Sequence, residues 1–376
     1  MSEPIRILQV LGRLDRGGAE TMIMNLYRHM DREQLQFDFV IHTEDVCDYT
    51  EEVGKLGGKI YSMEPFRAST APGYRKQWRR FFREHPEYRV IHGHMRSTAS
   101  LYLAEAKRAG LVTIVHSHNT SSGSGLSAVV KNLLQYPLRY QADYLFACGK
   151  RAGEWLYGKK ACDGPRFHLL PNGIETERFW FQSAVRTEKR RELGLGDDEL
   201  VFLHIGRMEE QKNHRFLLEI MREIRHMEKK SRLLLCGCGP LEEELKKQAG
   251  ADVVFLGVRD DIPDLMMAGD AMIFPSLFEG LPVTVVEAQA AGLSVLMSDT
   301  VTDEVILTDL VQTMSLHKSA GSWAERALEM AEKSPDRSCY AQQIRSAGYD
   351  VEQSARWLTE FYLSCLKGQS DCGDKA

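Results

Sequence analysis

Short apolar runs alternate along the chain with segments whose apolar residues recur three and four positions apart. The runs are typical of buried strands and the spaced segments of helices. The runs are Ile5–Leu11, Phe37–Ile41, Lys59–Met63, Arg89–Gly93, Thr113–His116, Tyr144–Cys148, Phe167–Leu170, and then Leu200–Ile205, Arg232–Cys236, Val253–Leu256, Ala271–Pro275 and Ser294–Met297. Continuous apolar strands alternating with helices predict parallel sheets covered on both faces. Two such series predict an α/β protein with two doubly wound domains.

Turn chemistry and composition place the expected domain boundary. Pro171-Asn172-Gly173 ends the first series, and the second restarts after a charged helical segment, Thr187–Leu193. We therefore expect a first domain over 1–176 and a second over 177–350. A C-terminal helix is expected over 351–366, followed by a polar, frayed tail over 367–376.

Composition narrows the function classes. The 376 residues carry 48 Lys and Arg against 53 Asp and Glu, a formal charge of −5, which is unlike the basic footprint of a nucleic-acid binder. The sequence has no apolar run long enough to span a membrane and no signal-peptide pattern at its start. Its eight cysteines are scattered rather than arranged as a disulfide framework. A cytoplasmic protein is expected.

Candidate ligand-binding residues follow the expected strands, because open α/β sheets bind ligands at the carboxyl ends of their strands. Gly17 and Gly18 follow the first strand, where a phosphate contact and a plain turn are about equally supported. The dinucleotide fingerprint is absent there, which argues against an NAD enzyme. Arg207 and Lys212 follow the first strand of the second series and could clamp a diphosphate, or form a solvated pair on a charged loop.

The segment from Phe274 to Glu287 carries the strongest signal. A strand ends, a Gly/Pro turn follows, and a helix starts near Pro282. Glu279 in the loop would accept hydrogen bonds from sugar hydroxyls, the free amides near Leu281–Thr284 would face phosphate, and Glu287 would accept from ribose hydroxyls. The alternative is a solvated Glu279 and a Glu287 that offsets the helix dipole. We favour binding, because Glu287 is embedded among apolar residues and a carboxylate there needs partners.

Two further segments leave alternatives open. Two histidine pairs, His92 with His94 and His116 with His118, follow neighbouring strands. A metal site is the weaker interpretation, and one histidine contacting a reacting sugar is the stronger. The basic and aromatic segment Arg75–Arg89 fits either a helix on an anionic membrane surface or, as we prefer, a crossover helix with its aromatic stripe on the sheet.

Taken together, these motifs resemble the retaining nucleotide-sugar glycosyltransferases of family 4. The residues that carry the resemblance are Gly17-Gly18-Ala19-Glu20, the His116 loop, Pro171-Asn172-Gly173-Ile174, Gly206-Arg207, Lys212-Asn213, Gly237-Cys238-Gly239-Pro240, and Glu279 with Glu287 in an E-x7-E arrangement. The likeness spans nearly the whole chain and is greatest to bacterial members that build capsular, exopolysaccharide or lipopolysaccharide chains. It implies the GT-B fold, in which two Rossmann-like domains face a cleft.

The resemblance also implies roles for individual residues. Donor binding would involve Gly17, Gly18, Arg207, Lys212, Gly237, Val258, Arg259, Glu279, Gly280, Leu281, Pro282, Val283 and Glu287. The backbone at Val258 and Arg259 would read the base, and the Val351–Leu366 helix would cross back onto the first domain. The catalytic set would be His116, Glu279, Arg207 and Lys212, with His118 as an alternative to His116. UDP is the carrier that the family favours.

The implied chemistry is hexosyl or N-acetylhexosaminyl transfer without a metal or other cofactor, since the sequence has no Asp-x-Asp motif and cations with helix amides can stabilise the leaving diphosphate. The implied acceptor is a saccharide or lipid-linked saccharide at the inner membrane face, where the protein would make peripheral contact. Two other functions stay open at this point: a sugar-nucleotide epimerase on the same fold, and a non-catalytic two-domain sugar-binding protein.

Overall fold

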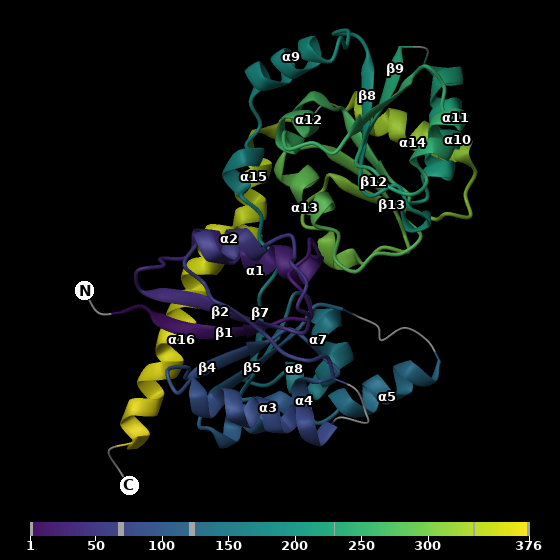
Figure 1. The fold of residues 1–376 in the computed structure, drawn as a ribbon. Coiled ribbons are helices and arrows are strands. Elements are labelled where there is room, and N and C mark those ends of the chain that lie inside the picture. The colour runs from purple at the N-terminus through teal and green to yellow at the C-terminus, as the bar shows by residue number, and fades with distance from the viewer. Residues whose placement is uncertain (1–2, 67–70, 120–124, 229, 334, 374–376) are drawn as a thin grey trace. The chain divides into compact units, whose positions relative to one another are not determined.

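The computed structural model describes residues 3–66, 71–119, 125–228, 230–333 and 335–373. The chain forms two compact units, which we describe separately (Figure 1). Unit 1 comprises Met1–Gly173 and Val351–Ala376, and unit 2 comprises Ile174–Asp350.

Unit 1 is built on a seven-stranded sheet of order β3-β2-β1-β4-β5-β6-β7, in which every pairing is parallel. Its strands are β1 Ile5–Val10, β2 Leu35–Ile41, β3 Ile60–Ser62, β4 Val90–Gly93, β5 Val112–Ser117, β6 Tyr144–Ala147 and β7 Phe167–Leu169. All seven strands expected in the first series are confirmed, with ends shifted by one or two residues.

Alternate residues of these strands point to opposite faces, and both faces are buried. Ile7 lies in one apolar cluster with side chains of α1 and the C-terminal helix, whereas Leu8 lies in another with side chains of α3 and α4. The helices of unit 1 are α1 Gly18–His29, α2 Thr50–Lys55, α3 Ala71–Glu84, α4 Ala99–Arg108, α5 Leu126–Gln135, α6 Leu138–Gln141, α7 Lys150–Tyr157, α8 Lys159–Cys162 and α16 Val351–Gly373.

Helix α16 returns the end of the chain to unit 1. Its residues Leu358 and Tyr362 are fully buried in the same cluster as Phe37, and the rings of Tyr362 and Phe37 meet edge to face at 6.1 Å. The helix continues past the expected end at Leu366 to Gly373. The tail is therefore helical over much of the stretch where we expected fraying.

Helix α3 packs as the crossover interpretation predicts. Its four aromatic residues Tyr74, Trp78, Phe81 and Phe82 are buried against the sheet. Two of its arginines form ion pairs with the buried carboxylate of Glu105, Arg75 at 2.6 Å and Arg79 at 2.7 Å. Part of the basic surplus of this helix is therefore neutralised within the unit.

Unit 2 is built on a six-stranded parallel sheet of order β10-β9-β8-β11-β12-β13. Its strands are β8 Leu200–Ile205, β9 Ser231–Cys236, β10 Val253–Gly257, β11 Ala271–Phe274, β12 Ser294–Ser298 and β13 Val311–Met314. The five expected strands are confirmed. The edge strand β13 is not among the expected elements, since its four residues VQTM are few and mix polar with apolar positions.

Helices cover both faces of this sheet as well. The α-helices of unit 2 are α9 Ser183–Glu192, α10 His214–Met227, α11 Glu242–Gln248, α12 Ile262–Ala268, α13 Val283–Ala290, α14 Ala320–Glu332 and α15 Tyr340–Ile344. Side chains of α12 and α13 pack in one cluster with Phe274 and Met297, and those of α10 and α14 in another with Ile273 and Leu296. The doubly wound α/β architecture expected for each half is therefore present.

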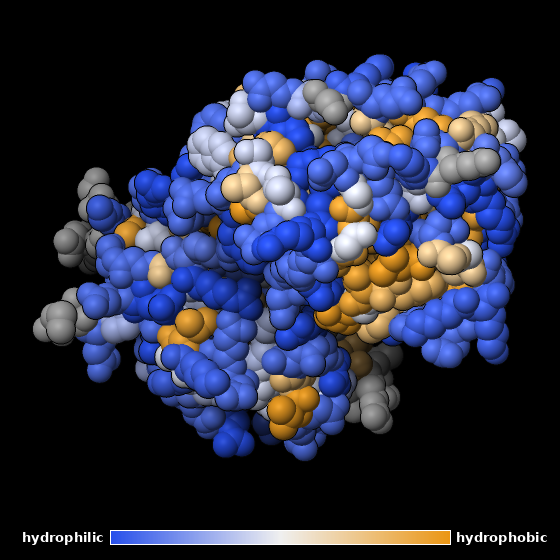
Figure 2. Space-filling view, turned by 90° about the horizontal axis from the view of Figure 1, so that it is seen from above, coloured by the Kyte–Doolittle hydropathy of each residue, from blue (hydrophilic) through white to orange (hydrophobic). Residues whose placement is uncertain are grey.

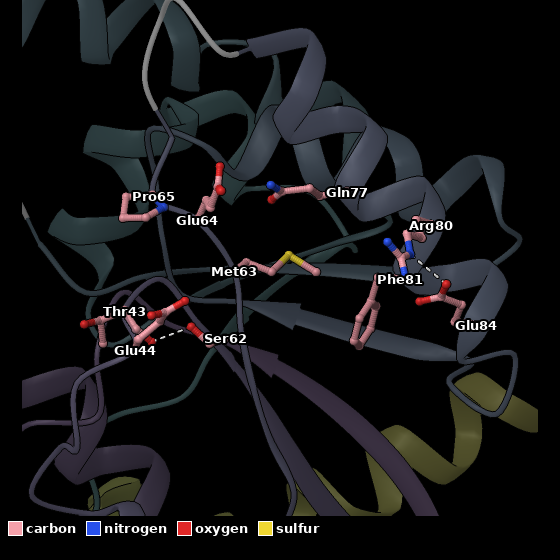
Figure 3. A pocket seen from close by; sticks show the side chains of 10 residues that line it. All are labelled: Thr43, Glu44, Ser62, Met63, Glu64, Pro65, Gln77, Arg80, Phe81 and Glu84. Carbon is pink, nitrogen blue, oxygen red and sulfur yellow. Dashed lines mark hydrogen bonds and ion pairs between the residues drawn. The ribbon is translucent and has the colours of Figure 1, made fainter.

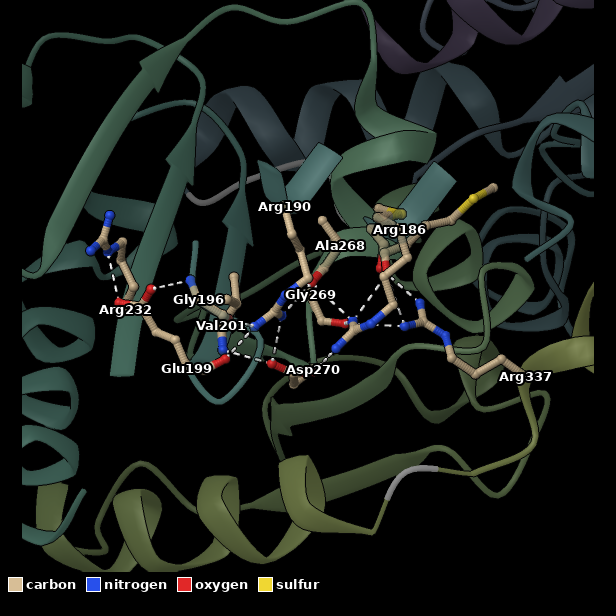
Figure 4. Close-up of polar contacts among 12 residues, drawn as sticks. Arg186, Arg190, Gly196, Glu199, Val201, Arg232, Ala268, Gly269, Asp270 and Arg337 are labelled. Carbon is tan, nitrogen blue, oxygen red and sulfur yellow. Dashed lines mark hydrogen bonds and ion pairs between the residues drawn. The ribbon is translucent and has the colours of Figure 1, made fainter. Parts of the chain in front are cut away.

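Three arginines hold the carboxyl end of α12 (Figure 4). Arg186 donates to the carbonyl oxygens of Ala268 and Gly269, each at 2.9 Å, and to Asp270 Oδ1 at 2.6 Å. Arg337 donates to the carbonyl oxygen of Gly269 at 3.0 Å, and Arg190 to that of Ala268 at 3.0 Å. Cations at a helix C-terminus satisfy carbonyls that have no partner within the helix. This cluster fixes the chain just before β11.

One face of the molecule is mostly hydrophilic. Figure 2 shows hydrophilic residues over most of the face in view, with separate hydrophobic areas among them. None of the described helices combines the length and the apolar character that a bilayer crossing requires.

Candidate active site

The donor-site residues predicted in unit 2 follow neighbouring strands of one parallel sheet. Gly206 follows β8, Gly237 follows β9 and Val258 follows β10, while the segment that leads to Glu279 follows β11. The strand order places β8 between β9 and β11. All these residues therefore lie at the carboxyl edge of the sheet, around the point where the strand order reverses, which is where such sheets bind ligands.

Backbone hydrogen bonds join these loops to one another. The amide of Gly206 donates to the carbonyl of Cys236 at 2.9 Å, and that of Gly237 to the carbonyl of Gly257 at 2.7 Å. Gly237 has a φ of +128°, and a Cβ there would lie 2.2 Å from the carbonyl oxygen of Gly206. Only glycine fits this position, because any side chain would clash with backbone and strain its own conformation.

Lys212 and Glu279 form the central polar contact of this edge. The Lys212 ammonium lies 2.7 Å from Glu279 Oε1 and 4.9 Å from the centre of the Phe274 ring. The two side chains are only 15% and 9% exposed. The structure therefore brings together two residues that the sequence placed in separate motifs, and a largely buried ion pair of this kind is costly to break from one side.

Gln211 supports the same carboxylate and was not identified from the sequence. Its amide nitrogen donates to Glu279 Oε2 at 3.1 Å and to the carbonyl oxygen of Phe278 at 2.9 Å. Its own backbone carbonyl accepts from the amide of Leu277 at 2.8 Å. Gln211 stands next to Lys212, which was the one available signal. It ties the loop after β8 to the loop after β11.

Arg207 lies in a different environment from Lys212. Its side chain is 71% exposed, and its guanidinium Nε is 3.9 Å from Glu209 Oε2. Such an exposed pair at long distance restrains the arginine little. Arg207 is thus a loosely held cation at the end of β8, whereas Lys212 is neutralised by Glu279.

Glu287 lies on α13, whose amino end follows the glycine and proline turn. The sequence placed the helix start near Pro282, and the structure has Pro282 as the residue that precedes the helix, with no side-chain cap. Backbone amides of Val283 and Thr284 therefore belong to the first turn, where helices leave amides without internal partners. Burial raises the pKa of the Glu287 carboxyl to about 7, while the Arg178 guanidinium acts in the opposite direction. A proton-sensitive carboxyl thus lies in α13, the helix that follows Gly280 and Leu281.

Val258 and Arg259 lie just past β10. Val258 is exposed. The Arg259 guanidinium donates to both carboxylate oxygens of Asp261, at 2.8 and 2.6 Å, so its side chain is held within the loop. A ligand at this segment could therefore contact its backbone groups and the Val258 side chain.

The glycine pair of unit 1 lies between β1 and α1. Gly17 precedes the helix, and Gly18 is its first residue, with open space where a Cβ would stand. A Cβ on Gly17 would lie 2.4 Å from Glu20 Oε2. Burial raises the pKa of the Glu20 carboxyl. The amino end of α1 therefore already has a carboxylate of its own chain beside it.

The four histidines form one cluster at the carboxyl ends of β4 and β5. Their rings lie face to face in part, with centroids 4.5 Å apart for His92 and His94 and 4.1 Å apart for His116 and His118. His116 is fully buried and neither ring nitrogen has a hydrogen-bond partner among the described residues. His118 is partly exposed. Of the two histidines that the sequence left as alternatives, His118 is the more accessible.

A metal ion is the alternative use of this cluster. Ligand atoms of His92, His94 and His116 lie within 4.8 Å of one another. However, His94 already uses both ring nitrogens, one with Gln9 and one with His118, each at 2.9 Å. A three-histidine site would have to break one of these bonds and hold a dication in a buried pocket without an anionic ligand. The hydrogen-bonded arrangement fits these residues better.

A separate pocket of about 340 Å³ opens in unit 1 beside α3 (Figure 3). Phe81 and Met63 supply apolar surface, and polar groups surround them, among them the Arg80 and Glu84 pair at 2.7 Å. The remaining lining residues are Thr43, Glu44, Ser62, Glu64, Pro65 and Gln77. No sequence pattern points to this pocket, because its polar residues come from three separate segments.

Two family models match the chain. Residues 16–178 match the model described as Glycosyltransferase Family 4, and residues 199–333 match Glycosyl transferases group 1. These ranges contain the glycine pair and histidine cluster in one case, and the Lys212, Glu279 and Glu287 region in the other.

Named relatives cover the chain to different extents. EpsF of Bacillus subtilis is 36% identical over 370 residues, which cover 95% of this chain and 96% of EpsF. The UDP-Gal:alpha-D-GlcNAc-diphosphoundecaprenol alpha-1,3-galactosyltransferase of Escherichia coli is 27% identical over 228 residues, covering 57% of this chain and 58% of that enzyme.

Solved structures share the fold. Anabaena HepE in complex with UDP superimposes with a TM-score of 0.75 at 17% identity, covering 96% of this chain and all of that one. A glycosyltransferase from Rickettsia africae superimposes with a TM-score of 0.77 at 14% identity, covering 97% and 100%. Together with the likeness to EpsF along almost the whole length, these matches show that the chain is a glycosyltransferase of the GT-B fold and belongs to glycosyltransferase family 4.

Proposed function

We propose that this glycosyltransferase moves a hexosyl or N-acetylhexosaminyl group from a UDP-sugar to a saccharide acceptor during synthesis of a cell-surface polysaccharide. The names of relatives support the substrate class, since the Escherichia coli enzyme transfers galactose from UDP to a saccharide on diphosphoundecaprenol. Solved relatives of the same fold hold UDP or UDP-glucose. A lipid-linked saccharide is accordingly our proposed acceptor.

The Lys212–Glu279 ion pair is the observation that carries this proposal. It lies at the carboxyl edge of a parallel sheet, and the loop that carries Glu279 leads into the amide-rich start of α13, the helix that contains Glu287. An incoming diphosphate can replace Glu279 as the partner of the Lys212 ammonium. Glu279 is then free to accept hydrogen bonds from hydroxyls of the transferred sugar, still oriented by Gln211. Glu287 would accept from the ribose hydroxyls.

Charge placement explains how the reaction could proceed without a metal. Cleavage of the sugar–phosphate bond leaves negative charge on the departing diphosphate. The Lys212 ammonium, the exposed Arg207 guanidinium and the first amides of α13 are the groups of unit 2 that would stabilise this charge. We propose retention of the anomeric configuration, with the acceptor hydroxyl attacking from the side of the leaving phosphate.

Peripheral membrane contact would bring the enzyme to a lipid-linked acceptor. We propose that the exposed basic residues of α3, Lys76 and Arg83, contribute to it, since Arg75 and Arg79 are already paired with Glu105. Attraction between basic side chains and anionic headgroups is on the order of 1 kcal/mol per residue near the surface. Co-sedimentation with anionic vesicles should therefore fall with added salt and in a Lys76→Glu, Arg83→Glu variant.

A panel of nucleotide sugars tests the proposed function. Each donor is incubated with the enzyme, and binding, slow donor hydrolysis and the anomeric configuration of the product are measured. We expect UDP-sugars to bind and to be hydrolysed slowly with retention. Conversion of the donor to an epimer without acceptor, or preference for a free sugar over UDP, would contradict transfer.

Matched variants locate the donor on the chain. We expect Lys212→Ala and Glu287→Ala to abolish transfer with the fold intact. Lys230→Ala serves as the control, because Lys230 pairs with Asp198 on the surface before β9, at the opposite edge of the sheet. Unchanged rates in Lys212→Ala and Glu287→Ala would refute the site.

A further inference from the structure

A continuous hydrogen-bonded chain links the last helix to the histidines of unit 1. The Tyr362 hydroxyl lies 3.2 Å from Gln9 Nε2, and Gln9 Oε1 lies 2.9 Å from His94 Nε2. His94 Nδ1 in turn lies 2.9 Å from His118 Nε2. The same hydroxyl of Tyr362 lies 2.6 Å from His92 Nδ1. Tyr362, Gln9 and His92 are fully buried.

All the side chains in this hydrogen-bonded series are electrically neutral at pH 7. Burial lowers the pKa of His92 and of His118 to about 3, and lowers that of His94 well below its ordinary value. Burial also raises the pKa of the Tyr362 hydroxyl. Each imidazole therefore carries one N–H and one bare nitrogen at neutral pH.

Hydrogen-bond polarity then decides which nitrogen carries each proton. The Gln9 amide nitrogen donates to Tyr362, so Gln9 Oε1 accepts from the N–H at His94 Nε2. His94 Nδ1 is consequently bare and accepts from the N–H at His118 Nε2. This leaves His118 Nδ1 bare. Tyr362, which accepts from Gln9, donates its O–H to His92 Nδ1.

The far end of this hydrogen-bonded series is an acceptor for which the described part of the protein supplies no donor. His118 Nδ1 has no hydrogen-bond partner among the described residues, although it is shielded from solvent in this structure. His118 follows β5, and the ring as a whole is partly exposed. An unpartnered buried acceptor costs free energy unless a ligand group satisfies it. A hydroxyl is the simplest donor that would do so.

We propose that Tyr362 is a positioning residue that, through Gln9 and His94, holds His118 as the Nε2–H tautomer, so that its bare Nδ1 accepts a hydrogen bond from a substrate hydroxyl. This inference rests on the proposed transfer function, and it selects His118 rather than His116 as the histidine that contacts the sugar. Gln9 and Tyr362, which lie near opposite ends of the sequence, thereby determine which nitrogen of His118 carries the proton.

The tautomers can be read directly from nitrogen chemical shifts in protein labelled with 15N-histidine. The His118 signals are assigned by their loss in His118→Gln. We expect wild-type His118 to be the Nε2–H tautomer. Tyr362→Phe keeps the ring that packs on Phe37 but removes the hydroxyl, and should convert His118 to a mixture of tautomers. A wild-type His118 protonated at Nδ1 would overturn the proposal without touching the donor site of unit 2.

Steady-state kinetics give the second readout. In Tyr362→Phe and Gln9→Met we expect kcat to fall roughly tenfold, as for loss of about one positioned hydrogen bond, with KM for the donor little changed. Tyr157→Phe is the control, since the buried Tyr157 hydroxyl donates to backbone carbonyls of Val115 and Phe146 and not to a histidine. A Tyr362→Phe enzyme that folds, keeps the wild-type His118 tautomer and keeps kcat would overturn the proposal. In that case loss of UDP binding in Lys212→Ala would still support the proposed transfer function.

Discussion

The Glu287 carboxyl links the stability of the protein to pH. Burial raises the pKa of its carboxyl to about 7, well above the ordinary value for glutamate. The folded protein therefore retains a proton on this group in a range of pH where the unfolded chain has lost it. Its contribution to stability is present at low pH and is lost as pH rises through about 7.

We predict that Glu287→Gln stabilises the protein at high pH. A neutral amide avoids the cost of a partly buried carboxylate, so at pH 8 the variant should unfold with a free energy roughly 1–3 kcal/mol above that of wild type. At pH 5 the two proteins should differ little. Urea unfolding at both pH values measures this, with Glu329→Gln as control on the surface of α14, where Glu329 pairs with Arg326. A wild type more stable than Glu287→Gln at pH 8 would contradict the burial argument.

The partners Lys212 and Glu279 should be strongly coupled in stability. Removing the ammonium leaves a largely buried carboxylate whose remaining side-chain partner is Gln211. We predict that Lys212→Ala costs about 2–4 kcal/mol of unfolding free energy, and that Glu279→Gln restores part of it in the double variant. A double-mutant cycle by chemical unfolding gives the coupling energy. Additive single effects would show that the pair does not interact in solution.

The sequence identified which individual residues carry charged or polar groups suited to a ligand, but it did not show which other residues those groups contact. Glu279, Glu287 and Lys212 stand out by their motif, but the pairing of Lys212 with Glu279 depends on how the loops after β8 and β11 approach one another. Gln211 was missed because a glutamine beside a lysine carries no signal of its own. His116 and His118 could not be separated, since both lie at the end of the same strand and only packing shows which ring covers the other.

Among the elements, the loops after β8, β9 and β10 are joined to one another by backbone hydrogen bonds. At Gly237 the loop after β9 passes close to the backbone of the loop after β8. We predict that Gly237→Ala lowers the unfolding free energy by more than about 2 kcal/mol and weakens UDP binding, because the new methyl group would lie 2.2 Å from the Gly206 carbonyl oxygen. Thermal unfolding and UDP titration check this.

Gly321→Ala is the matched control for that substitution. Gly321 lies in α14 of the same unit, and a Cβ there meets only Ser319 Oγ, at 3.8 Å. Alanine should therefore be neutral or slightly stabilising at this position. Equal behaviour of the two alanine variants would show that the loops adjust freely, contrary to the tight approach of backbone at Gly237.

The arginine cluster at the end of α12 should act on stability alone. Arg337 donates to backbone carbonyls of Met266, Gly269 and Ala291. We predict that Arg337→Met lowers unfolding free energy by about 2–4 kcal/mol while the folded protein binds UDP normally. Arg326→Met, which removes an exposed ion pair with Glu329, should cost less than about 0.5 kcal/mol. Loss of UDP affinity in folded Arg337→Met would place this cluster in the donor site.

The spacing of apolar residues predicted most of the helices and strands. It failed where contacts with other parts of the fold determine whether a segment is a strand or a helix. The strands of both sheets were found because parallel strands buried on both faces form continuous apolar runs. The edge strand β13 has no such run, and only its pairing with β12 makes it a strand. Helix α16 extends past Leu366 through a polar stretch that lacks the apolar spacing used to predict helices.

For the molecule as a whole, the proposed charge chemistry does not depend on a metal ion. The candidate donor site of unit 2 offers an ammonium, a guanidinium and helix amides, and the histidines of unit 1 are hydrogen-bonded to one another and to Gln9. We therefore predict that EDTA leaves the rate of transfer unchanged. Activity that disappears with EDTA and returns with Mg²⁺ or Mn²⁺ would overturn the proposed role of the cations.

The two-unit organisation could be inferred from sequence, whereas the chemistry of each unit could not be inferred completely. Two strand series with a turn at Pro171-Asn172-Gly173 indicate two sheets. The return of the last helix to unit 1 followed from family resemblance rather than from any pattern in its residues. Its link through Tyr362 to the histidines became apparent only in three dimensions, because hydrogen bonds over such sequence separations leave no local pattern.

Calorimetric titration of UDP, in buffer that contains EDTA, measures donor binding at unit 2 without relying on turnover. Wild type is compared with Lys212→Ala, Glu287→Ala and the control Lys230→Ala. We expect saturable binding to wild type and to Lys230→Ala, and affinity at least about tenfold lower, or more than about 1.4 kcal/mol weaker, in the other two. Equal UDP affinity in all four proteins would contradict the placement of the donor at this edge of unit 2.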